Sequence, residues 1–132
     1  MIEIAILITA ILYGGMVLFS FGFAALVFSA LPVEHAGAFI RKSFPYFYLF
    51  VIATSSIAAF MFWMIDSMFS MNLMLLISLT ALFSRQVLMP SINNATDNNL
   101  KTRFKVLHSF SVAISLSHIA ISGYVIIQLY SS

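Results

Sequence analysis

Residues 101–130 read KTRFKVLHSFSVAISLSHIAISGYVIIQLY, a basic beginning followed by a long stretch without a single Asp, Glu, Lys or Arg. About 20 apolar residues in a helix are enough to cross the hydrocarbon core of a bilayer. The last charged residue here is Lys105, and apolar side chains continue to Tyr130. The stretch therefore predicts a membrane-spanning helix that starts at a polar interface.

Three similar apolar stretches precede it, so the predicted spans cover about residues 4–31, 46–65, 71–89 and 103–130. Pro32 and Pro90 follow the first and third spans and favour helix ends there. Only 8% of the residues are charged, against about 25% in a soluble domain, so the chain cannot cover a water-facing surface. The sequence predicts a single all-α domain, residues 1–132, which is an integral membrane, antiparallel four-helix bundle.

The junction between the first two spans is predicted to form a short helix of its own, over about residues 33–43. Phe39 and Ile40 adjoin Arg41 and Lys42 in this segment. Apolar and basic side chains mixed in this way are typical of a helix that lies along the membrane surface.

The basic residues occur at only two junctions, the first and the third. They are Arg41, Lys42, Arg85, Lys101, Arg103 and Lys105. Alternate junctions of a four-span chain lie on one side of the membrane, and the positive-inside rule makes that side cytoplasmic. We therefore expect both termini and the middle junction to lie outside. The net charge of +2 then reflects orientation and contact with bilayer lipids, and no nucleic-acid partner is expected.

One face of the fourth span carries a row of polar residues at helical spacing. His108, Ser111, Ser115, His118 and Ser122 follow at steps of three and four, which predicts that this face is turned to the interior of the bundle. At 1.5 Å per residue the two histidines lie ~15 Å apart along the axis. They cannot bind one metal ion together.

A histidine at membrane depth is a functional candidate because a neutral imidazole can ligate haem iron or copper, or relay a proton. The structural alternative is a hydrogen bond between helices. On the functional interpretation His108, His118, Ser111 and Ser115 would contact a cofactor, for which haem b is the first candidate.

A second candidate site lies around the middle junction, where methionines cluster at Met61, Met64, Met68, Met71 and Met74. Thioether sulfur favours Cu(I), so the cluster predicts copper binding near the outer surface. The alternative is that methionine fills irregular spaces in the core.

Arg85 lies one helical turn before Pro90, on the membrane side of the basic junctions. A buried or interfacial arginine needs an anionic partner, and either Asp97 or a lipid headgroup could supply it. We interpret Arg85 and Asp97 as a structural or anion-binding clamp rather than as catalytic residues.

Most of the chain also resembles the TMEM205-like family of small membrane proteins, whose bacterial members are called DUF4149. The matching motifs are Gly14-Gly15, Leu31-Pro32, Ala36-Gly37, Phe44-Pro45-Tyr46-Phe47-Tyr48, Arg85, Leu88-Met89-Pro90, Ile92-Asn93, Asp97, Phe104, Leu107-His108 and Ser111-Val112. The resemblance implies a four-helix membrane protein and makes Arg85, Asp97 and His108 motif positions, but it implies no established reaction. This sequence departs from the family pattern at Ala25, where many members carry proline, and at Ser115, where many carry asparagine. We expect the bacterial inner membrane.

Three functions are compatible with these features, and they remain open at this stage. The first is a membrane protein that binds a haem-like ligand, with an enzymatic version that oxidises a porphyrinogen as the small protoporphyrinogen oxidases do. The second is Cu(I) binding or transport. The third is a structural subunit of a membrane complex or a homo-oligomer. Hydrolysis is excluded because the four acidic residues, Glu3, Glu34, Asp66 and Asp97, lie at span ends, away from the serines at depth.

Overall fold

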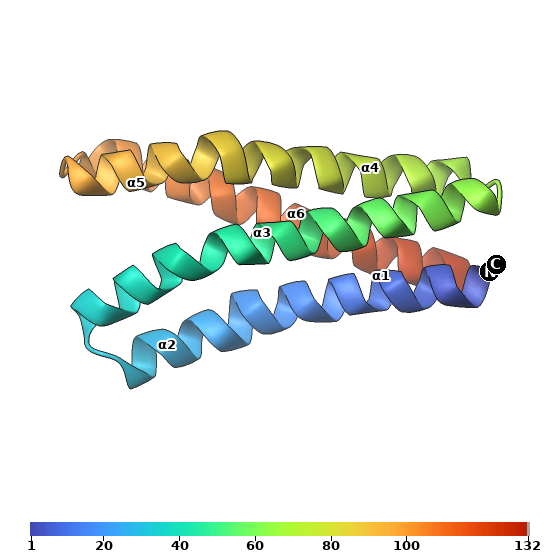
Figure 1. Ribbon diagram of the computed structural model, residues 1–132, viewed down its shortest axis with the longest axis horizontal. Helices are drawn as coiled ribbons and strands as arrows, with labels where there is room; N and C mark the ends of the chain where they lie inside the picture. Colours follow the sequence, from blue (N-terminus) through green and yellow to red (C-terminus); the bar gives the residue numbers. More distant parts are fainter. Residues whose placement is uncertain (132) are drawn as a thin grey trace.

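The computed structural model describes residues 1–131, which form long helices joined by short turns (Figure 1). The elements in chain order are α1 (Ile2–Val17), the π-helical turn η1 (Leu18–Phe23), α2 (Ala24–Ala30), α3 (Val33–Met64), α4 (Met68–Phe83), the π-helical turn η2 (Ser84–Leu88), α5 (Met89–Asp97) and α6 (Lys101–Ser131). They make four continuous rods, each long and apolar enough to cross a bilayer. The protein is an all-α, four-helix integral membrane bundle, as the sequence predicts.

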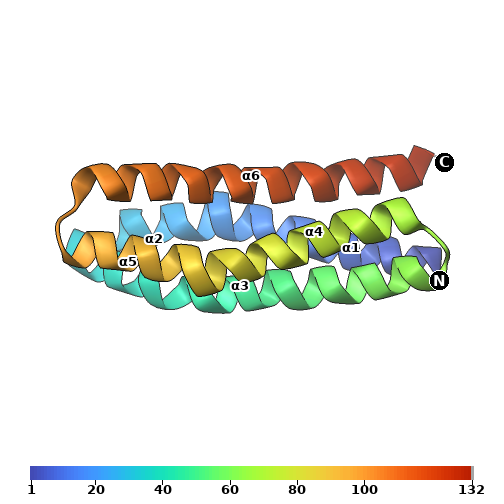
Figure 2. The ribbon, with the colours of Figure 1, turned by 90° about the horizontal axis from the view of Figure 1, so that it is seen from above.

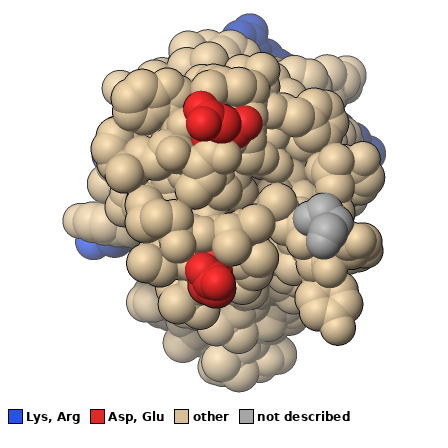
Figure 3. All heavy atoms as spheres, turned by 90° about the vertical axis from the view of Figure 1, so that its right-hand side faces the viewer, with Lys and Arg blue, Asp and Glu red and all other residues tan. Residues whose placement is uncertain are grey.

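The four rods alternate in direction. The α2–α3 and α5–α6 connections lie at one end of the bundle, while the α3–α4 turn and the N-terminus lie at the other (Figures 1 and 2). We call the first the basic end because it carries Arg41, Lys42 and the lysines and arginine of early α6. We call the second the terminal end. Figure 3 looks onto the terminal end and shows acidic side chains there, with basic ones only at the edge.

Two of the turns are built in the same way. After α3, Asp66 adopts φ 59°, and after α5, Asn99 adopts φ 55°. The amide of the following residue then closes each helix, with Ser67 N donating to Phe62 O at 2.9 Å and Leu100 N to Ala95 O at 2.9 Å. This is the Schellman arrangement, and aspartate and asparagine tolerate the left-handed conformation that it requires.

The separate interfacial helix predicted over residues 33–43 does not form. Instead α3 runs without a break from Val33 to Met64 and includes Pro45. Prolines are tolerated inside membrane helices. Pro45 leaves the backbone oxygen of Arg41 without its helical donor, and its own backbone oxygen accepts from Arg85 Nε at 3.2 Å. The polar junction residues and the second span are therefore one rod.

Pro90 does not end its helix either, so the helix end predicted there from the sequence is wrong. The backbone widens to a π-helical turn just before it, where Met89 N donates to Ser84 O, and Pro90 then occupies the first turn of α5. Inside a continuous rod a proline removes one helical hydrogen bond and its ring crowds the preceding turn, and the wider π-helical turn leaves room for that ring. The third rod consequently continues to Asp97.

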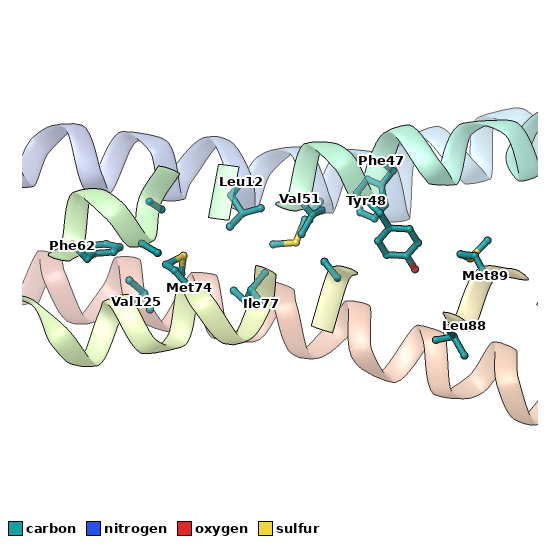
Figure 4. Packing of buried hydrophobic residues seen from close by; sticks show 14 of the residues in the cluster. Leu12, Phe47, Tyr48, Val51, Phe62, Met74, Ile77, Leu88, Met89 and Val125 are labelled. Atoms are coloured by element: carbon teal, nitrogen blue, oxygen red, sulfur yellow. The ribbon is translucent and has the colours of Figure 1, made fainter. Parts of the chain in front are cut away.

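The core runs along the whole bundle and is centred on α3, which lies between α1 and α4 (Figure 1). Figure 4 shows Leu12, Val51, Phe62, Met74 and Val125 meeting from four different helices. All five are buried within one cluster. Around it, large apolar side chains cover the outside of the bundle, as expected of a surface that faces lipid.

A lateral groove at the polar face of α6

The polar face of α6 is turned inward over most of its length. Ser111, His118 and Ser122 are buried, and Ser115 is half-buried. Ser122 Oγ donates to the backbone oxygen of His118 at 2.9 Å, so it is satisfied within its own helix. These positions follow from the spacing of the residues, because steps of three and four place them on one side of a helix.

His118 makes the central contact of this face. Its Nε2 lies 2.6 Å from Thr80 Oγ1 on α4, and the Thr80 hydroxyl also lies 2.7 Å from the backbone oxygen of Leu76. The sequence pointed to His118 but not to Thr80. A lone threonine in an apolar span carries no signal of its own, since its hydroxyl usually binds a backbone oxygen one turn earlier.

A groove of about 300 Å³ runs between α4 and α6 at the level of this pair. Its lining residues are Leu76 and Thr80 from α4 and Phe110, Ala113, Ile114, Ser117, His118 and Ile121 from α6. Such a volume lies at the lower end of the range for small-molecule sites, which are mostly apolar with a few placed polar groups. The groove has that character.

His108 has a different environment, although it shares the row. It is exposed, and its ring stacks on Phe104 with centroids 5.4 Å apart and an interplanar angle of 8°. The candidate cofactor residues are therefore split. His118 and Ser115 belong to the middle of the bundle, whereas His108 lies near the basic end on the outside of α6.

Ser111 lies between these two levels and faces α3. Its Oγ is 3.4 Å from the hydroxyl of Tyr48, and Tyr48 is among the largest fully buried side chains. Figure 4 shows the Tyr48 hydroxyl pointing away from its own helix into the bundle. The pair satisfies two hydroxyls across α3 and α6, which is a structural contact between helices.

Arg85 and Asp97 do not bind each other. Asp97 accepts two hydrogen bonds from Arg41, from Nη1 at 2.8 Å and from Nη2 at 2.9 Å. Arg85 instead donates to Pro45 O and, through Nη1, to Gln86 Oε1 at 3.0 Å. The predicted clamp thus consists of two separate contacts from α3 to the third rod, because Arg85 and Asp97 are twelve residues apart and lie ~18 Å apart along that rod.

The methionines also separate. Met74 is fully buried in the core, and Met61 and Met71 pack against it, which is the core-filling role weighed from the sequence. Met64 and Met68, on either side of the α3–α4 turn, are exposed. Within residues 1–131 no group of three or more His, Cys, Asp or Glu side chains is placed to hold a metal ion.

A wider hollow of about 760 Å³ opens at the α5–α6 turn, lined by Asn99, Leu100, Lys101, Thr102, Arg103, Val106 and Leu107. Nearly all of these side chains are exposed. The hollow is an open surface at the basic end, whereas the groove beside His118 lies near the middle of α6.

The family comparison covers most of the elements described above. A domain of unknown function, DUF4149, matches residues 7–101. The chain belongs to the DUF4149 family. The matched residues include Thr80 and Leu76 on the α4 side of the groove, together with Arg41, Arg85 and Asp97, and they end at the first residue of α6. No curated protein and no solved structure matches this chain.

Proposed function

We propose that this DUF4149 protein binds a small, largely apolar ligand from within the membrane, in the groove between α4 and α6. The observation that carries the proposal is the composition of that groove, in which apolar side chains surround one buried histidine. A ligand would gain apolar contact from the lining and orientation from the imidazole, as in other small-molecule sites.

Haem b is the candidate that the sequence suggested, and one feature of His118 supports it. A histidine that ligates a metal usually has its other ring nitrogen held by an outer partner, which fixes the orientation of the ring. Thr80 is such a partner for Nε2. His118 would then hold the iron through Nδ1, and the haem would supply redox chemistry at this groove.

Purification in a mild detergent from cells supplied with haem tests the proposal. We expect a co-purified small molecule in organic extracts, and a Soret band if that molecule is haem. His118→Ala should abolish its retention, while His108→Ala serves as the matched control on the same helix and should retain it. Metal analysis of the same samples tests copper, for which Met64 and Met68 are accessible.

Two outcomes would contradict the proposal. Retention that depends on His108 and not on His118 would move the site to the basic end. A preparation without any bound small molecule, but with stoichiometric membrane-protein partners, would favour a structural subunit instead.

We further propose that the basic end faces the cytoplasm and that both termini lie outside the bacterial inner membrane. The separation of the basic side chains from the terminal end supports this orientation through the positive-inside rule. Alkaline phosphatase fused to the C-terminus should be active, and green fluorescent protein at the same place should be dark in the periplasm after export in the unfolded state. A fluorescent fusion without phosphatase activity would show that the C-terminus lies in the cytoplasm and would contradict this orientation.

A further inference from the structure

The hydrogen bonds around His118 determine which of its ring nitrogens carries the proton. The Thr80 hydroxyl has a single hydrogen. The backbone oxygen of Leu76, at 2.7 Å, can only accept, so this hydrogen points to Leu76. Thr80 Oγ1 then accepts from Nε2 of His118 at 2.6 Å, which is the assignment that places a hydrogen in both short contacts. The imidazole is thereby held with its proton on Nε2 and a lone pair on Nδ1.

Nδ1 has no partner but is still accessible. Among residues 1–131 it forms no hydrogen bond, and the one fully buried side-chain nitrogen or oxygen without a partner is Ser84 Oγ. Nδ1 is therefore not fully buried, and it belongs to a residue that lines the groove.

The other polar side chains of the groove are already satisfied. Ser117 Oγ donates to Ala113 O at 2.8 Å, and Thr80 Oγ1 both donates and accepts. The remaining lining side chains are apolar. The groove thus presents acceptor lone pairs, on Nδ1 of His118 and on Ser117 Oγ, and its lining side chains offer no free donor hydrogen.

We infer that the ligand of this groove is an apolar molecule that carries a hydroxyl donor, of the phenol or hydroquinone class, and that its hydroxyl donates to His118 Nδ1. A site built around one buried acceptor discriminates strongly against an analogue that has only acceptors, since both lone pairs would lie unpaired in an apolar surrounding. The corresponding carbonyl compound should bind much less well. This inference depends on the proposed ligand site, and it assigns that site to a phenolic ligand in place of haem b.

A short-chain ubiquinone analogue is a suitable probe because its two redox forms share one skeleton and differ at the polar atoms. The reduced form carries hydroxyls and the oxidised form carbonyls. We expect the reduced form, measured under anaerobic conditions by calorimetry on the full chain in nanodiscs, to bind at least tenfold more tightly than the oxidised form. His118→Phe keeps an aromatic ring and should remove this preference.

Two further variants separate the lone pair from the general shape of the groove. His108→Ala replaces the other histidine of the same helix, which does not line the groove, and should leave the preference unchanged. Thr80→Val keeps the side-chain shape but removes the acceptor for Nε2, so the ring can present an N–H to the groove. We expect the preference for the reduced form to decrease in Thr80→Val. The thermal unfolding transition of each variant, compared with that of the parent chain, checks that the variant folds.

The outcomes distinguish this inference from the proposed function. Equal binding of both redox forms, abolished in His118→Phe, would overturn the inference and leave the groove as a ligand site. Binding of haem with no binding of either probe would do the same. Absence of any ligand in the groove would overturn both. Nitrogen NMR of the chain labelled at histidine gives an independent check, since a proton found on Nδ1 of His118 contradicts the inference directly.

Discussion

The helices α3 and α6 are nearly equal in length and contain 18-residue apolar windows of the same mean hydropathy, yet 39% of the window of α3 is buried inside the bundle, against 17% for that of α6. The residues that each helix buries also differ. α3 buries mainly apolar side chains, among them Tyr48, Val51 and Phe62, whereas three of the four residues that α6 buries are polar. Overall apolarity therefore does not decide which helix is central.

The difference follows from what drives helix association in a membrane. Lipid tails are as apolar as leucine, so helices associate through close packing and a few polar contacts. Alanines and serines of α3 and α4 permit close approach there, with Ser56 Oγ 2.8 Å from Ser78 Oγ. α6 is held to α4 by the His118–Thr80 contact and leaves a groove beside it.

The largest expected effect comes from blocking the close packing of α3. A Cβ on Gly15 would lie 2.5 Å from the ring of Phe50 on α3, whereas one on Gly14 would meet nothing within 4 Å. Gly15→Val should destabilise the fold by about 1–3 kcal/mol through overpacking. Gly14→Ala is the matched control and should be neutral or stabilising by up to about 1 kcal/mol. Unfolding in mixed micelles measures both, and equal effects would contradict close packing at Gly15.

The second prediction concerns Ser84, whose buried hydroxyl has no partner within the described residues. An unsatisfied buried hydroxyl costs about 1–3 kcal/mol, so Ser84→Ala should raise the stability of the fold by about 1 kcal/mol. Ser55→Ala is the control, because Ser55 Oγ donates to Val51 O at 2.6 Å. If Ser84→Ala lowers the melting temperature, the hydroxyl has a partner in the membrane.

The third prediction tests whether α6 depends on its polar contact with α4. A double-mutant cycle of His118→Phe and Thr80→Val should give a coupling energy of about 0.6 kcal/mol, the average for hydrogen bonds between membrane helices. A control cycle of His118→Phe and Ser117→Ala should give a coupling energy near zero. A cycle without coupling for His118 and Thr80 would mean that the groove, and not the hydrogen bond, positions α6.

The smallest expected effect belongs to the ion pair of the basic end. Arg41 and Asp97 are both about half exposed, and exposed ion pairs contribute little and are screened by salt. Asp97→Asn should therefore lower the melting temperature slightly at low salt and hardly at all at high salt. A large loss independent of salt would show that the pair is shielded from water in the membrane.

The sequence by itself was sufficient to predict four apolar spans, their alternation and the inward face of α6. These features depend on local properties, namely the length of an apolar stretch, the placement of charged residues and the helical period of Ser111, His118 and Ser122. The ends of the rods were predicted less well. Pro45 and Pro90 both lie inside continuous helices, and the backbone widens to a π-helical turn just before Pro90.

Only the tertiary structure decided which side chains meet. Thr80 as the partner of His118, Arg41 as the partner of Asp97, and the burial of Met74 all depend on how far each helix is rotated and shifted against its neighbours. Those quantities result from packing over the whole bundle, and small residues far from a site influence them. The groove beside His118 is such a result, since it exists where α4 and α6 are held together at one polar contact instead of along a closely packed face.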